Sequence, residues 1–192
     1  LLNHVVGGAV NAADLSTGYI NTSATFNGEA DAPLSMYVNT TEGVMLNGIS
    51  SVTTADVSAD NGVIHIVDAV ITLPSVVTFA AADAATFSEL VGALTRADQP
   101  DYVSVLTTAN GTAPAPFTVF APTNQAFADL YAELGVAGID DVDGAILTAT
   151  LNTHVVAGAN VRAEDLVTGT VATLGDAVEI DATTAIITDP NG

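Results

Sequence analysis

Cysteine, tryptophan and lysine are all absent from the 192-residue sequence. Without cysteine the chain forms no disulfide, binds no metal through thiolates and has no thiol nucleophile. Basic residues are nearly absent as well, since only Arg96 and Arg162 oppose 22 carboxylates, and the formal net charge is −20. Such a surface repels phosphate backbones and anionic lipid. We therefore expect neither nucleic acid nor a bare membrane surface among the partners.

Aromatic residues are also scarce, at 5%, although 49% of the chain is hydrophobic. The core should therefore consist mainly of small aliphatic side chains. No apolar run approaches the roughly 20 residues of a transmembrane helix, so we predict that the chain does not span a membrane. Residues 1–10 lack the charged start, apolar centre and cleavage site of a signal peptide. We expect residue 1 to be an internal position and any export signal to lie outside this chain.

The sequence repeats itself with a period near 150 residues. His4–Val6 reappears as His154–Val156, and Asp14–Leu15 reappears as Asp165–Leu166. A period of this size is a domain length rather than the length of a solenoid repeat. The repeat predicts two copies of one domain within the chain.

Neither copy is expected to be a whole domain. The first copy starts at the repeated histidine and runs to Pro74, and the second ends at residues 189–192, which line up best with Asn47–Gly48. We interpret residues 1–74 as the C-terminal half of one domain. Residues 76–192 are then the N-terminal and central part of the following domain, without its closing strand.

Hydrophobic periodicity divides the second copy into helices followed by strands. Apolar residues at helical spacing predict helices over 84–96, just after Pro100, from Thr123 to Gly135 and over 141–154, with Asp83 or Thr86 capping the first. A strand is predicted at 117–120. Short β-rich pieces follow Gly169 and also fill residues 19–72. This order predicts an α+β fold with a wedge-like sheet.

Three motifs carry a resemblance to a known family. They are Phe117–Phe127 (FTVFAPTNQAF), Leu151–Val156 (LNTHVV) and Asn61–Pro74 (NGVIHIVDAVITLP). In this order along a domain they resemble the conserved blocks of the fasciclin (FAS1) domain family, and together they place essentially the whole chain in it. The resemblance implies a FAS1-like α+β fold, with N-terminal helices packed on a wedge-shaped β-sheet region. It also implies a secreted or cell-surface protein with tandem adhesion domains.

The closing motif has the composition of a strand. Its β-branched run is long enough for a central strand. Alternation places three residues on one face and three on the other, namely Val63, His65 and Val67 against Ile64, Ile66 and Asp68. A buried strand that carries a histidine and an aspartate must provide partners for both.

Histidine occurs only at positions 4, 65 and 154. We expect each ring to bond a backbone carbonyl or a neighbouring carboxylate inside the fold. The alternative, a zinc or acid–base site, needs convergent ligands, and the sequence has no HxxxH or HExxH spacing. We therefore predict no metal site and no cofactor.

The family resemblance also implies where adhesion contacts lie. The dipeptide Tyr-His of the central block is implicated in cell binding in animal members, but Thr153 and Asn3 precede the histidines here. The Asp-Leu pairs resemble a second adhesion-associated spot, but we favour the simpler interpretation, in which the aspartate starts a turn. The candidate adhesion or structural residues are His4, His65, Asp68, His154, Val155, Val156, Asp165 and Leu166.

Acidic residues cluster at Asp140, Asp141 and Asp143. A calcium loop would require the full twelve-residue pattern with its terminal glutamate, which is absent. We favour helix capping, because carboxylates at a helix start are stabilised by the helix dipole.

Catalytic and nucleotide-binding motifs such as GxSxG and phosphate-cradling loops are missing, and we predict that the protein is not an enzyme. The leading hypothesis is an extracellular or cell-surface adhesion module that binds surface or matrix proteins or glycans by weak contacts in a tandem array. The alternative is a structural subunit that forms filaments, in which residues 49–74 of one copy complete residues 76–192 of another. A third hypothesis, a lipid or small-ligand binder with a pocket between helices and sheet, has no specific residue in its support.

Overall fold

The computed structural model describes residues 1–29 and 31–189. Pro190–Gly192, which the sequence repeat aligns with the region of Asn47–Gly48, lie outside the described residues. The chain forms two compact units. Unit 1 contains Leu1–Pro74 and Ala81–Asp83, and unit 2 contains Ser75–Ala80 and the rest of the chain from Ala84.

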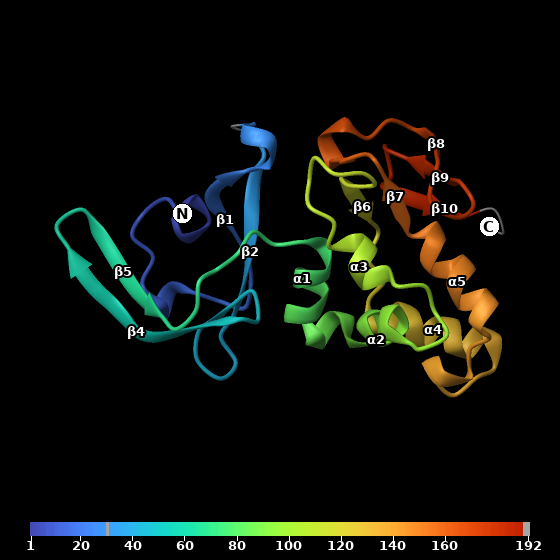
Figure 1. The fold of residues 1–192 in the computed structure, drawn as a ribbon, viewed down its shortest axis with the longest axis horizontal. Helices are drawn as coiled ribbons and strands as arrows, with labels where there is room; N and C mark the ends of the chain where they lie inside the picture. The colour runs from blue at the N-terminus through green and yellow to red at the C-terminus, as the bar shows by residue number, and fades with distance from the viewer. Residues whose placement is uncertain (30, 190–192) are drawn as a thin grey trace. The chain divides into compact units, whose positions relative to one another are not determined.

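Unit 1 is built around an antiparallel five-stranded sheet (Figure 1). Its strands are β1 (Gly18–Thr25), β2 (Pro33–Asn39), β3 (Met45–Leu46), β4 (Ser50–Ala59) and β5 (Gly62–Val67), in the order β1-β2-β3-β4-β5. Three short 3₁₀ turns accompany them, η1 (Leu2–His4), η2 (Ala12–Asp14) and η3 (Phe26–Gly28).

Strand β5 corrects one prediction. It forms an antiparallel hairpin with β4 and lies at the end of the strand order, so among the described residues it is an edge strand and not a central one. The predicted alternation is confirmed, because Ile64 and Ile66 are exposed whereas His65 is half-buried. A β-branched run is compatible with a strand that has one buried face and with a strand that has two buried faces. The composition of this run therefore did not show whether the strand would be central or at an edge.

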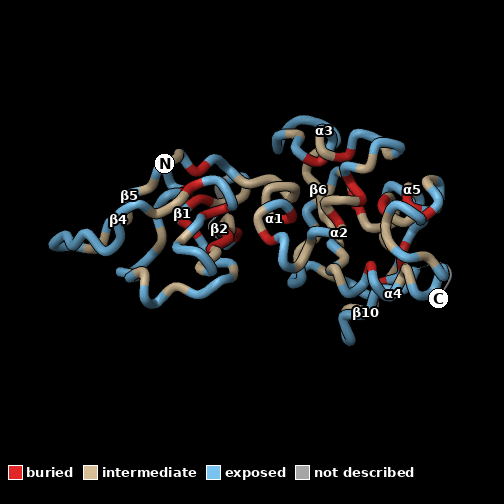
Figure 2. Tube along the Cα trace, turned by 90° about the horizontal axis from the view of Figure 1, so that it is seen from below, coloured by how far each residue is buried: buried red, intermediate tan, exposed pale blue. Residues whose placement is uncertain are grey.

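The core of unit 1 is small and aliphatic. Met36, Val38, Leu46 and Ile71 are buried together. Buried residues, red in Figure 2, gather on β1 and β2. The core therefore joins the inner face of the sheet to the segment that follows β5.

Unit 2 contains most of the described α-helices. They are α2 (Ala84–Thr95), α3 (Tyr102–Leu106), α4 (Asn124–Leu134) and α5 (Gly144–Thr153), and the division between the units falls within α1 (Val76–Ala82). Two further 3₁₀ turns are η4 (Ile139–Asp141) and η5 (Ala163–Asp165). One antiparallel pair joins β6 (Phe117–Val119) to β7 (Val155–Ala157), and a second sheet contains β8 (Gly169–Val171), β9 (Val178–Asp181) and β10 (Ile186–Thr188).

The helix ends follow the local sequence signals. Thr123 accepts a hydrogen bond from the amide of Ala126 at the start of α4, and Gly135 ends that helix in the left-handed conformation (φ 68°). Asp143 accepts bonds from the amides of Ala145 and Ile146, so α5 begins at residue 144 and not at 141 as predicted. Capping, the favoured interpretation of this acidic cluster, is confirmed for Asp143.

Asp83 corrects a second prediction. It was a candidate cap for the helix that begins at Ala84, but its carboxylate is buried and accepts a hydrogen bond from the Tyr37 hydroxyl at 3.0 Å. The partner lies 46 residues away, and no local pattern indicated it. Together the helices and antiparallel sheets make a mixed α+β fold, as predicted.

Candidate functional site

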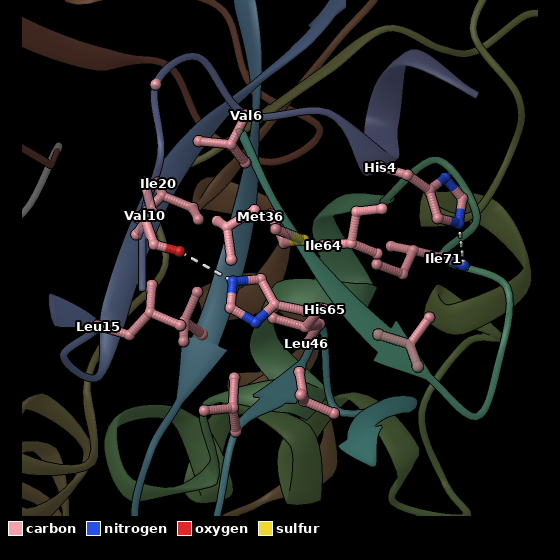
Figure 3. A pocket seen from close by; sticks show the side chains of 16 residues that line it. His4, Val6, Val10, Leu15, Ile20, Met36, Leu46, Ile64, His65 and Ile71 are labelled. Atoms are coloured by element: carbon pink, nitrogen blue, oxygen red, sulfur yellow. Dashed lines mark hydrogen bonds between the residues drawn. The ribbon is translucent and has the colours of Figure 1, made fainter. Parts of the chain in front are cut away.

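Mostly apolar side chains of unit 1 line a pocket of about 260 Å³ that is partly open to solvent. Figure 3 shows side chains from the N-terminal segment, the sheet and the segment after β5 around one common space. The lining residues are His4, Val6, Gly8, Val10, Leu15, Ile20, Met36, Val38, Val44, Leu46, Val52, Val63, Ile64, His65, Val67 and Ile71.

His65 connects β5 to the N-terminal segment. Its Nε2 donates a hydrogen bond to the carbonyl of Val10 at 2.8 Å, shown as a dashed line in Figure 3. Its Nδ1 accepts from the amide of Asp56 at 3.4 Å and lies 4.0 Å from the carboxylate of the same residue. In the tautomer that carries its proton on Nε2, the ring uses both nitrogens in these two hydrogen bonds.

His4 makes a second contact across the pocket wall. The amide of Ile71 donates to His4 Nε2 at 3.0 Å, which ties the segment after β5 to the first turn of the chain (Figure 3). This partner differs from the expected carbonyl or carboxylate. An unprotonated Nε2 accepts hydrogen bonds, just as a backbone carbonyl oxygen does. The sequence did not show whether the ring would act as a donor or as an acceptor.

The other predicted site residues lie apart from this pocket. Asp68 accepts from the amide of Ser51 at 2.7 Å, and His154 donates through Nδ1 to the carbonyl of Thr150 at 2.8 Å. Val155 and Val156 are buried in β7. Asp165 is exposed and Leu166 is half-buried at turn η5. The structure thus brings together only His4 and His65 of the eight predicted residues.

Two backbone features recur at positions that the sequence repeat aligns. The amide of Ser23 donates to the carbonyl of Val5 at 2.7 Å, and at the equivalent place the amide of Leu174 donates to the carbonyl of Val155 at 2.8 Å. Gly18 and Gly169 have the same φ of 151°. The surroundings differ, because the side chain of Val155 is 2% exposed in the core of unit 2 and that of Val5 is 44% exposed.

Few groups in unit 1 have perturbed acidity. Burial raises the pKa of Tyr37, and the hydrogen bond to Asp83 raises it further.

Among residues 1–29 and 31–189, no group of three or more histidine, aspartate or glutamate side chains is arranged to hold a metal ion. None of the described helices combines the length and the apolar character of a membrane span.

Comparison with known proteins gives the family. The family model of the fasciclin domain matches the chain in two segments, residues 1–74 and 85–188. A comparison with curated proteins gave no match. The two matched segments cover most of the chain and coincide with the regions that contain the repeated backbone turns. The chain belongs to the fasciclin domain family.

Proposed function

We propose that this chain is an adhesion or matrix module that acts outside the cell or at its surface. The observation that carries the proposal is the match of the fasciclin model to two successive segments of one chain. Fasciclin domains in general are extracellular, adhesion-type modules that do not catalyse reactions. The module binds proteins or glycans, and residues 1–74 and 76–192 are parts of two domains in a tandem array.

Weak contacts suffice for this role when they are repeated. Linking binding modules turns the second encounter into an intramolecular one and raises avidity without any new contact. A net charge of −20 keeps such a chain soluble and favours partners that carry basic groups. At 0.15 M salt the charges are screened beyond about 8 Å, so attraction acts mainly at contact.

We place the contact at the exposed turn η5. Asp165 is exposed and makes no side-chain hydrogen bond with the described residues, so its carboxylate is available to a partner. Its counterpart Asp14 instead accepts from the backbone and side chain of Asn11 and closes its own turn. Val155 and Val156 are buried and offer no such surface.

The proposal is tested with purified chain immobilised at increasing density, over which matrix proteins and glycans are passed. Retention should rise more steeply than density, and Asp165→Ala should lower it. Asp14→Ala removes the same charge from the matched turn and serves as the control. Absence of retention at every density, with and without calcium, would contradict the proposal.

A second candidate function, filament formation by strand donation, is favoured by the difference between two histidines. Nε2 of His4 accepts from the amide of Ile71, whereas Nε2 of its counterpart His154 has no hydrogen-bond partner among the described residues. A closing segment from a second copy would supply the equivalent amide. Light scattering over a wide concentration range should then show assemblies that His154→Ala weakens. A chain that stays monomeric at all concentrations would exclude this function.

A further inference from the structure

We propose that Asn110 is a site of covalent modification, where the side-chain amide is lost spontaneously and the residue becomes aspartate or isoaspartate. The reaction is characteristic of asparagine followed by glycine, because glycine has no side chain to hinder its backbone nitrogen. This dipeptide begins at Asn27, Asn47, Asn61, Asn110 and Asn191. The last lies outside the described residues, so the structure distinguishes among four copies of the same two residues. The inference does not depend on the adhesion function.

The reaction needs only water and a base. A base removes the proton from the backbone nitrogen of Gly111, and this nitrogen forms a bond to Cγ of Asn110. The bond between Cγ and Nδ2 breaks, and Nδ2 takes a proton from solvent and leaves as ammonia. Water then opens the resulting cyclic imide at one of its two carbonyl groups. One opening gives aspartate, and the other gives isoaspartate, in which the chain continues through the former side-chain carbon.

The turn at Asn110 holds the two reacting groups together. The amide of Gly111 donates a hydrogen bond to Oδ1 of Asn110 at 3.0 Å, so the attacking nitrogen lies beside the group that it attacks. The amide of Thr112 donates to the carbonyl of Ala109 at 3.1 Å, which closes the turn with Gly111 at a φ of 87°. Groups held near contact in this way react faster than the same groups on a freely rotating chain.

The same turn is open to solvent. Asn110 and Gly111 are both exposed, and a Cβ added at Gly111 would meet nothing within 4 Å. The base and the water that the reaction consumes therefore both reach the site. The turn lies in the loop between α3 and β6, so formation of the imide interrupts neither a helix nor a strand.

The other three described copies are held in ways that oppose the reaction. Asn47 is 2% exposed, and its Oδ1 accepts a hydrogen bond from the amide of Tyr37 at 2.8 Å. Asn27 has φ 51° and ψ 16°, which turns the next backbone nitrogen away from its Cβ. The glycine that follows Asn61 is paired with Ala59 across the β4–β5 hairpin. Each of these sites must open locally before the nitrogen can meet Cγ.

The experiment incubates the full 192-residue chain at mildly alkaline pH and follows each site by peptide mapping with mass spectrometry. Asn110 should lose its amide at least about tenfold faster than Asn47, which reacts only through local opening. It should also react faster than Asn27 and Asn61. The rate should increase with pH, because the nucleophile is the deprotonated nitrogen. A reaction at any of the other three sites that equals or exceeds the rate at Asn110 would overturn the proposal.

The same measurement in concentrated urea separates the effect of structure from that of sequence. Once the chain is unfolded, all four dipeptides lie in a flexible backbone, and their rates should become similar. A ranking that persists in urea would refute the structural cause.

A matched pair of variants assigns the reaction to one position. Glutamine keeps the amide but lengthens the side chain by one methylene group, which disfavours ring closure. Asn110 and Asn61 are both exposed, so either substitution should leave the fold intact. Asn110→Gln should remove most of the early mass gain of the intact folded chain, and Asn61→Gln should leave it unchanged. An unchanged early mass gain in Asn110→Gln would overturn the proposal.

Discussion

The repeated valine provides a controlled comparison between the two units. Val5 follows turn η1 and Val155 follows helix α5, and the carbonyl of each accepts a backbone hydrogen bond, but the two residues are 44% and 2% exposed. Valine-to-alanine substitution removes two methyl groups. At about 0.8 kcal/mol for each methylene-sized group, the transfer loss at Val155 is about 1.6 kcal/mol. The cavity left in the core brings the expected cost of Val155→Ala to about 2–3 kcal/mol.

Val5→Ala should cost much less. About half of its side chain is already in contact with water, so less apolar surface is lost and no closed cavity forms. We expect a decrease of under about 1 kcal/mol in the free energy of unfolding of unit 1. Methyl NMR through a urea titration measures this quantity for each unit separately, which matters because the two units need not unfold together.

Equal destabilisation by the two substitutions would contradict this prediction. If Val5→Ala destabilises unit 1 as much as Val155→Ala destabilises unit 2, then Val5 is covered in solution. The difference in packing between the two valines would then be wrong, although the two backbone hydrogen bonds would stand.

Three further predictions concern single residues. Gly48→Ala should destabilise unit 1 by about 1–2 kcal/mol in the same urea titration, because Gly48 has a φ of 69° and an added Cβ would lie 3.2 Å from the Cα of Ala82. Gly62→Ala, where nothing lies within 4 Å, is the control, and an equal cost at both glycines would contradict the prediction. Asp143→Ala should lower the free energy of unfolding of unit 2 by about 1 kcal/mol, because α5 loses its N-terminal cap. Asp140→Ala is the control and should change it little. A destabilisation that appears only in the presence of calcium would favour an ion site instead. Hydrogen bonds from the side chain and backbone of Thr183, and then from the side chain of Thr184, lower the pKa of Asp181 to about 2. The stability that the ionised Asp181 contributes should therefore be fully present above the ordinary carboxyl pKa and should be lost as the pH falls through about 2. A titration midpoint near 3.8 for this carboxyl group, measured by NMR, would refute the prediction.

Local signals in the sequence predicted much of the fold. Thr123 and Gly135 were assigned to the two ends of one helix, and both are found there. The alternation along residues 63–67 gave the correct inner face of β5. These features depend on residues within a few positions of one another, and such short-range rules carry over directly from sequence to structure.

Long-range partners were not predictable in the same way. His4 meets Ile71 across 67 residues, and Tyr37 meets Asp83 across 46. Each histidine was expected to find a partner, but only the chain path decides which group arrives. The same applies to the pocket of unit 1, because its wall combines the N-terminal segment with β5, and no single stretch of sequence indicated it.

Aggregation of coated beads tests the proposed adhesive role most directly. Beads that carry the purified chain at a series of densities are mixed with beads that carry matrix proteins or glycans, at several salt concentrations and with or without calcium. Mixed aggregates should form above a threshold density, because many weak contacts act together. Beads that stay dispersed at every density and in every ionic condition would contradict it.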